Sequence, residues 1–104
     1  MPEAYRISIS PEAATDLHAI HDYIAQDSVD NAARMVGRIL DAIDRLKSLP
    51  HRAIARRQSR KVPHPVRSLP VRPYMVFFRV LDEERVIRVL TIRHGARRRP
   101  KTFE

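Results

Sequence analysis

Two apolar runs near the C-terminus constrain the fold most. The segments YMVFFRVL (74–81) and RVIRVLTI (85–92) are rich in β-branched and aromatic residues and are separated by the turn-like triplet DEE. Because most positions in both runs are apolar, they are predicted to be the adjacent central strands of a hairpin, covered on both faces. A shorter run, VRSLPV (66–71), contains Pro70 and is followed by Pro73, which predicts an edge or bent strand.

The N-terminal segment predicts a strand followed directly by a helix. Alternation of apolar and polar residues in AYRISIS (4–10) is typical of a strand with one buried face. Ser10 can then cap a helix that has Pro11 at its first position. The apolar stripe of this helix contains Leu17, Ile20 and Ile24.

A second amphipathic helix follows, with Ser28 or Asp30 as its N-cap and Pro50 as its end. Each helix has one apolar face, so the pair is expected to form a hairpin that packs on a sheet. The predicted class is α+β, an antiparallel sheet in the order β-α-α-β-β-β packed against a two-helix hairpin. The apolar stripe of the second helix consists of Ala32, Val36, Ile39, Ile43 and Leu46, broadened by Leu40 and Leu49.

The length of 104 residues suits one domain spanning residues 1–104, in which we expect a mobile basic loop at 49–65 and a basic tail at 93–104. The absence of cysteine excludes disulfides, thiolate metal sites and cysteine nucleophiles, and fits a reducing compartment. The N-terminus has no apolar signal region and no run is long enough to cross a bilayer. We therefore expect a cytoplasmic protein with no membrane association.

Charge is distributed unevenly. Residues 1–51 carry five Lys or Arg and eight Asp or Glu, a net charge of −3, whereas residues 52–104 carry fifteen and four, a net charge of +11. No carboxylate occurs between Asp44 and Asp82. The basic groups of that stretch must therefore face water, a phosphate or an acidic protein.

The last apolar run ends in TIRHGARRRP (91–100), where a histidine lies among four arginines. These residues could form a catalytic cluster, an anion- or partner-binding tail, or a solvated end; we favour the binding tail. His94 is the one candidate for general acid–base catalysis. The alternative is a structural turn at His94-Gly95 whose imidazole bonds a backbone carbonyl.

Several segments together resemble the RelE/ParE superfamily of bacterial type II toxins. They are YRISISPEAATDLHAIHDYIA, AIDRLKSLP, VRSLPVRPYMVFFRV and IRVLTIRHGARRR, which span about Tyr5 to Arg99. The resemblance implies a toxin neutralised by a cognate antitoxin, ParD-like or similar, whose acidic C-terminus wraps the toxin. Operator DNA would be contacted only indirectly, through that antitoxin. RelE-like members cut mRNA on the ribosome, whereas ParE-like members inhibit DNA gyrase.

The ParE-like branch is the better match. Nuclease members commonly have an arginine at the start of the third strand, where this chain has Met75, and a terminal tyrosine or histidine, where it has Phe103. We therefore predict a gyrase inhibitor without catalytic residues. The alternatives are a ribosome-dependent mRNA endoribonuclease that uses His94, Arg72 and Arg93, and a degenerate toxin that retains only antitoxin binding.

The resemblance and the charge map together define two candidate surfaces. The predicted gyrase-binding residues are Arg93, His94, Arg97, Arg98 and Arg99. The predicted antitoxin-binding residues form an apolar groove along the helices with two nearby cations: Leu17, Ile20, Tyr23, Ile24, Val36, Leu40, Arg72 and Arg79.

Cofactors and metals are not expected. His18 and His21 could share a metal with Asp22, but no third strong ligand follows in sequence, and a surface role is preferred. Tyr23 and Tyr74 could stack nucleobases, although a core or interface position is the commoner use of an aromatic residue.

Overall fold

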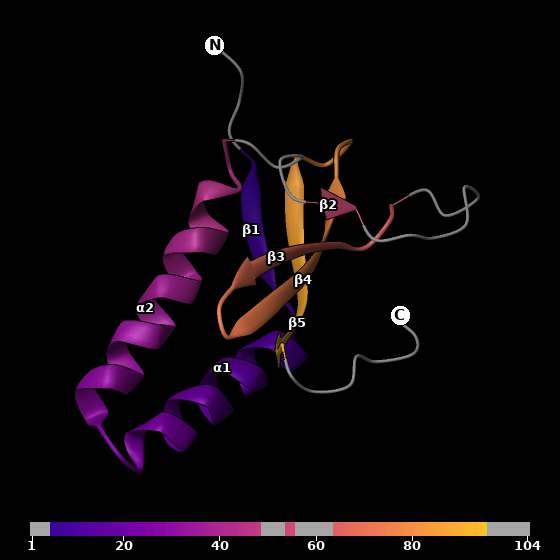
Figure 1. Cartoon of the computed structure of the whole chain (residues 1–104). Helices are drawn as coiled ribbons and strands as arrows, with labels where there is room; N and C mark the ends of the chain where they lie inside the picture. Colours follow the sequence, from indigo (N-terminus) through magenta and orange to yellow (C-terminus); the bar gives the residue numbers. More distant parts are fainter. Residues whose placement is uncertain (1–4, 49–53, 56–63, 96–104) are drawn as a thin grey trace.

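The computed structural model of the chain describes residues 5–48, 54–55 and 64–95. Five strands form one sheet in the order β1-β5-β4-β3-β2, and Figure 1 shows the two helices together on one side of it. The predicted α+β class is therefore confirmed. The elements are β1 (Arg6–Ile9), α1 (Pro11–Ala25), α2 (Val29–Arg45), β2 (Ile54–Ala55), β3 (Arg67–Val71), β4 (Tyr74–Leu81) and β5 (Val86–His94).

The sheet is mixed and not purely antiparallel as expected. Strands β2, β3, β4 and β5 pair antiparallel, but β1 pairs parallel with β5, from Arg6 opposite Val86 to Ile9 opposite Val89. Alternation within a strand shows which face is buried and carries no information about the direction of a partner 80 residues away. The two longest strands, β4 and β5, are interior, as predicted.

Both helices begin at serine caps. The Ser10 hydroxyl accepts a hydrogen bond from Ala13 N at 3.0 Å, and the Ser28 hydroxyl accepts one from Asn31 N at 3.1 Å, so Ser28 and not Asp30 caps α2. Helix α2 ends at Arg45, before the proline expected to stop it. Just after the helix, Leu46 is buried and the Lys47 carbonyl accepts a hydrogen bond from Tyr5 N at 3.2 Å, so the end of α2 lies beside the start of β1.

The predicted basic loop contains one element that the sequence did not indicate. Ile54 and Ala55 form the two-residue strand β2, which pairs with Arg67 and Ser68 of β3. His64 is also described, and its carbonyl oxygen accepts a hydrogen bond from Arg79 Nε at 3.0 Å. The segments 49–53 and 56–63, on which the rest of this prediction falls, lie outside the described residues.

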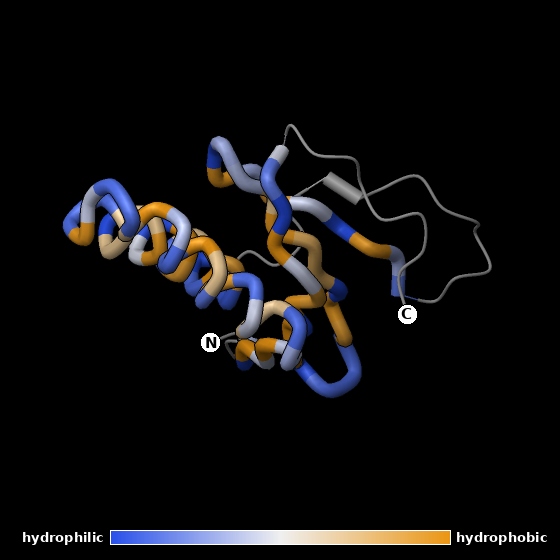
Figure 2. Tube along the Cα trace, turned by 90° about the horizontal axis from the view of Figure 1, so that it is seen from below, coloured by the Kyte–Doolittle hydropathy of each residue, from blue (hydrophilic) through white to orange (hydrophobic). Residues whose placement is uncertain are grey.

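The core lies between the helices and the sheet. Figure 2 shows hydrophilic and hydrophobic residues alternating along both helices, so that each can turn an apolar stripe to the strands. Phe77 lies between two core residues of β4, points to the other face of the sheet and is buried there as well. No helix in the described ranges is long and apolar enough to cross a membrane. The main cluster consists of Ala13, Ile20, Met35, Ile39, Ile43, Leu46, Val71, Tyr74, Val76, Phe78, Val80, Ile87, Val89 and Ile92.

A β-bulge in β5 joins this strand to the start of α1. Phe77 lies opposite Thr91 and Phe78 opposite Val89, which leaves Leu90 as an extra residue. On the other side of β5, Ser10 N donates to the Val89 carbonyl at 3.0 Å and the Ser10 hydroxyl donates to the Leu90 carbonyl at 2.8 Å. Where β1 stops, Ser10, the N-cap of α1, therefore satisfies two carbonyls of β5 and holds the strand beside the start of the helix.

Candidate functional site

A pocket of about 550 Å³ lies where the end of β5 meets α1. It brings together residues predicted for two separate roles, since Arg93 and His94 were expected to bind the target while Ile20 and Tyr23 were expected to bind the antitoxin. We call it the strand-end pocket. Its lining consists of Asp16, Ala19, Ile20, Tyr23, Tyr74, Ile92, Arg93 and His94.

The two charged groups of the strand-end pocket, Asp16 and Arg93, are both hydrogen-bonded to strand β5, and Arg93 is also bonded to Glu12 of α1. Asp16 Oδ2 accepts from the Thr91 hydroxyl at 2.6 Å and from Ile92 N at 2.9 Å. Arg93 donates from Nε to the Thr91 hydroxyl at 3.1 Å and from Nη2 to Glu12 Oε2 at 3.1 Å. This network links α1 to residues 75–81 positions further along the chain. It therefore draws the Arg93 side chain toward α1.

His94 is the last residue of β5 and is half-buried. Its ring meets that of Tyr74 edge to face, with centroids 5.3 Å apart and an interplanar angle of 78°. Tyr74 is itself buried, in agreement with the core interpretation of this aromatic residue. Immediately after His94, Gly95 N donates to the Pro73 carbonyl at 2.6 Å, which joins the end of β5 to the β3–β4 turn.

Met75 lies opposite Arg93 in the β4–β5 ladder. Met75 therefore occupies the strand position opposite Arg93, where the nuclease members of the superfamily were expected to carry an arginine. Arg97, Arg98, Arg99 and Phe103 lie outside the described residues.

The predicted antitoxin-binding residues on the helices are only partly accessible. Ile20 is buried, whereas Leu17, Ile24 and Val36 are half-buried. Tyr23, with 66% of its surface exposed, and Leu40, with 40%, are the members that remain open to a partner. The predicted residues of α1 other than Tyr23 thus pack in or against the core, whereas neither Val36 nor Leu40 of α2 belongs to the core cluster.

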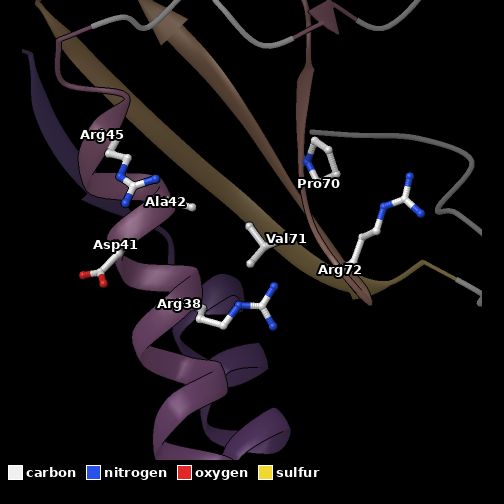
Figure 3. A pocket seen from close by; sticks show the side chains of 7 residues that line it. All are labelled: Arg38, Asp41, Ala42, Arg45, Pro70, Val71 and Arg72. Atoms are coloured by element: carbon white, nitrogen blue, oxygen red, sulfur yellow. The ribbon is translucent and has the colours of Figure 1, made fainter.

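Of the two cations predicted to assist there, Arg79 is half-buried and its Nε is bonded to the His64 carbonyl. Arg72 is exposed and lines a second pocket of about 490 Å³ between α2 and β3 (Figure 3). We call this pocket the α2–β3 cleft. It is lined by Arg38, Asp41, Ala42, Arg45, Pro70, Val71 and Arg72.

The sequence analysis did not select Arg38 and Arg45. Their spacing of seven residues places them on one face of α2, two turns apart. That spacing was the only feature of the sequence that could have indicated a shared surface. Nothing in the sequence indicated which strand this face meets. The sequence analysis also missed Asp16, whose partners are 75 and 76 residues away.

Within the described residues, no group of three His, Cys, Asp or Glu side chains is placed to hold a metal ion. His18 is exposed, and His21 Nδ1 lies 3.4 Å from Asp22 Oδ1 at the surface of α1.

Comparison with protein families agrees with the fold and with the resemblance of the sequence. The family model for the ParE toxin of type II toxin-antitoxin systems (parDE) matches residues 7–99. The chain therefore belongs to the ParE toxin family, within the RelE/ParE superfamily. No curated protein sequence matches it significantly.

Solved structures show the same architecture. The chromosomal ParDE toxin-antitoxin system from P. aeruginosa contains a chain that is 28% identical, with a TM-score of 0.68 over 88% of this chain and 96% of that one. The RelBE2 complex of Mycobacterium tuberculosis (18% identical, TM-score 0.64, 88% and 98% covered) shares the fold. So does the archaeal RelE-RelB complex from Pyrococcus horikoshii OT3 (17% identical, TM-score 0.68, 91% and 99% covered).

Proposed function

We propose that this toxin acts by binding DNA gyrase and is held inactive by a cognate antitoxin with an acidic, amphipathic C-terminal segment. The observation that carries the gyrase proposal is the pairing of charges at the strand-end pocket. RNA cleavage needs a base for the 2′-hydroxyl, an acid for the leaving oxygen and cations directed at the phosphate. Here the Asp16 carboxylate already accepts two hydrogen bonds, and the Arg93 guanidinium is already bonded to Glu12.

Such an arrangement suits recognition better than catalysis. Arg93 and His94 lie at the edge of a pocket that also contains Tyr23 and Ile92, and a protein partner can insert an apolar or aromatic side chain there. Met75, opposite Arg93 in the ladder, has a thioether side chain that can pack but carries no proton to transfer. In this proposal the following arginines, Arg97, Arg98 and Arg99, add charge to the same contact.

One observation favours the alternative, a ribosome-dependent mRNA endoribonuclease. His94 stands next to Arg93 on a pocket that also holds two tyrosines, and an imidazole beside a cation and aromatic rings is a combination that nucleases use. A third possibility, a toxin that has lost activity and only binds antitoxin, predicts neither effect below.

The target is tested by two assays on the same purified protein. We expect inhibition of gyrase-catalysed supercoiling and no cleavage of mRNA in a purified translation system. Replacing Arg97, Arg98 and Arg99 together by alanine should raise the inhibitory concentration more than His94→Gln does, because charge and not proton transfer supplies the effect. Arg6→Ala, which removes one exposed arginine near the opposite end of β5, is the control and should change little.

The outcomes separate the three functions. Cleavage of ribosome-bound mRNA that disappears in His94→Gln, with the fold and antitoxin binding intact, would establish the nuclease. Neither inhibition nor cleavage, with antitoxin still bound, would establish the degenerate toxin.

The antitoxin part of the proposal has its own test. A partner that folds on the toxin surface buries apolar area, so calorimetry with the product of the neighbouring reading frame should give a large negative heat-capacity change. Deletion of residues 95–104 should abolish gyrase inhibition while antitoxin affinity changes less than about tenfold, or about 1.4 kcal/mol. A heat-capacity change near zero would contradict coupled folding and binding.

A further inference from the structure

Three arginines of α2 lie along one side of the helix. Arg34, Arg38 and Arg45 follow one another at spacings of four and seven residues, which places them on one face. At 1.5 Å per residue, the row from Arg34 to Arg45 is about 16 Å long. Arg72, at the end of β3, adds a fourth guanidinium on the other side of the α2–β3 cleft (Figure 3). We call these four residues the arginine row.

The arginine row carries positive charge that nearby carboxylates do not neutralise. All four residues are exposed, and none of them forms an ion pair within the part of the chain that the structure describes. Arg38 Nη1 lies 3.8 Å from the Met35 sulfur, which is a weak acceptor. Asp41 is the one carboxylate that lines the cleft, and Figure 3 shows its side chain turned away from Arg72. The guanidinium groups are therefore available to an anionic ligand.

The length and the composition of the row indicate a polymeric phosphate ligand. A single small anion could contact only part of a row of this length, whereas successive groups of a polymer could contact all of it. Every cation of the row is an arginine, whose planar guanidinium can donate two parallel hydrogen bonds to phosphate oxygens. The net charge of +11 on residues 52–104 attracts the same kind of ligand over a longer distance.

We propose that the arginine row binds the phosphate backbone of duplex DNA. Arg34, Arg38 and Arg45 contact phosphates along one DNA strand, and Arg72 contacts the same backbone from the other side of the cleft. Contacts to phosphates position a protein on DNA without reading its sequence, so binding should not depend on sequence. The proposal rests on the proposed function only for its natural occupant, the DNA on which gyrase acts.

Duplex DNA suits the row better than a single strand does. A duplex carries one charge per about 1.7 Å of its axis and is stiff over the length of the row, so its phosphates need little ordering before they bind. Proteins that bind single strands commonly stack the unpaired bases on aromatic rings. None of the residues that line the α2–β3 cleft is aromatic.

The arginine row begins beside the surface proposed to bind gyrase. Arg72 lines the α2–β3 cleft, while Tyr74, two residues later, lines the strand-end pocket. The turn between them is joined to the end of β5 by the hydrogen bond from Gly95 N to the Pro73 carbonyl. A toxin whose strand-end pocket contacts gyrase therefore presents the row on an adjoining surface, where it can contact DNA held by the enzyme.

The test measures the affinity of the full-length toxin for a fluorescent 30-base-pair DNA duplex by anisotropy, between about 50 and 200 mM salt. The Arg34→Gln/Arg38→Gln/Arg45→Gln variant should lose at least thirtyfold in affinity. Its slope of log K against log salt concentration should become less negative by about 2.7, because each phosphate contact contributes about 0.9. Arg38→Gln alone should lose about three- to tenfold. The matched variant Arg6→Gln, which removes an exposed arginine outside the row, should lose less than twofold.

Asp41→Asn provides a measurement that misfolding cannot imitate. It removes the one carboxylate of the cleft and should tighten DNA binding about two- to fivefold, through reduced repulsion of the phosphates. Two further probes test the class of ligand. A second duplex of unrelated sequence should bind within twofold of the first, and a 30-nucleotide single-stranded RNA should bind at least threefold more weakly.

Several outcomes would overturn the proposal. They are absence of DNA binding, equal losses in Arg38→Gln and Arg6→Gln, an unchanged salt slope in the triple variant, and no gain in Asp41→Asn. Tighter binding of the RNA that is lost in the triple variant would assign the row to RNA instead. The assay contains no gyrase, so DNA binding by the row without inhibition of supercoiling would refute the proposed target and leave the DNA site standing.

Discussion

The strand-end pocket and the α2–β3 cleft are both lined by arginine and aspartate, but only in the strand-end pocket are these charged side chains hydrogen-bonded to oppositely charged or polar partners. At the strand end, Asp16 and Arg93 are hydrogen-bonded to Thr91, Ile92 and Glu12. In the cleft, Arg38, Asp41, Arg45 and Arg72 form no ion pair within the described residues. The difference indicates that the first set of charges contributes to folding, whereas the second set, exposed and without ion pairs in the described residues, does not.

The largest expected effect is on stability, from the two aspartates. Asp16→Ala leaves the Thr91 hydroxyl and the Ile92 N–H without their charged acceptor and should lower the free energy of unfolding by about 2–3 kcal/mol. Asp41→Ala, the same change in an exposed residue of the other helix, should alter it by less than about 0.5 kcal/mol. Urea denaturation of both variants measures the contrast. Equal effects would mean that the distinction between the regions is wrong.

The two described glycines, one on α2 and one at the end of β5, allow the space around the backbone of the two regions to be compared. A Cβ at Gly37 of α2 would meet no atom within 4 Å, so Gly37→Ala should stabilise the protein by about 0.5–1 kcal/mol through helix propensity. A Cβ at Gly95 would lie 3.1 Å from the Pro73 carbonyl, so Gly95→Ala should destabilise it. Thermal denaturation should therefore show shifts of opposite sign, and a gain at both positions would show that the end of β5 is less tightly joined to the turn than the structure indicates.

A smaller effect on stability is expected from two surface ion pairs, one at the strand-end pocket and one at the end of α2. Arg93 and Glu12, 3.1 Å apart, are both considerably exposed, as are Lys47 and Asp44, 2.7 Å apart at the end of α2. Double-mutant cycles with glutamine replacements should give a coupling energy of about 0.2–1 kcal/mol for the first pair. The local pair should give about 0.2–0.5 kcal/mol. Both coupling energies should decline between low and high salt. A coupling energy that does not change with salt would indicate packing of the side chains instead of attraction between their charges.

The smallest effect concerns a hydrogen bond far from both pockets. The Tyr5 hydroxyl donates to Asp82 Oδ1 at 2.6 Å, and this bond, with the charge of the same carboxylate, raises the pKa of Tyr5 above its usual value of 10.0. A pKa raised by folding contributes stability below the unfolded pKa of about 10, and this contribution is lost as pH rises through the folded value. The stability difference between the wild type and Tyr5→Phe should thus shrink at alkaline pH, as urea titrations at pH 8 and pH 11 would show. A constant difference would exclude the linkage.

Local features of the fold could be predicted from the sequence because the interactions that cause them are between residues close together in the chain. Strand β4 has the bounds that its apolar run predicts, and Ser10 with Pro11 starts α1 as expected, since capping and alternation depend on neighbours a few residues away. The RelE/ParE superfamily and its ParE-like branch could be recognised from four segments because the resemblance lies in the amino-acid sequence itself. Arg93 and His94 were predicted to bind the target because they belong to an arginine-rich segment that follows the last apolar run. The pocket that they line was not predicted.

What only the tertiary structure decided concerns residues far apart in sequence. The parallel pairing of β1 with β5, the bond from Asp16 to Thr91 and the approach of Arg72 to Arg38 and Arg45 each join segments that meet only in the folded chain. The amino-acid sequence determined that the second half of the chain is strongly basic, with no carboxylate between Asp44 and Asp82. Docking decided which of those cations meet an acidic residue of the first half and which stay unpaired, because an ion pair forms only where the packed backbone brings opposite charges within about 4 Å.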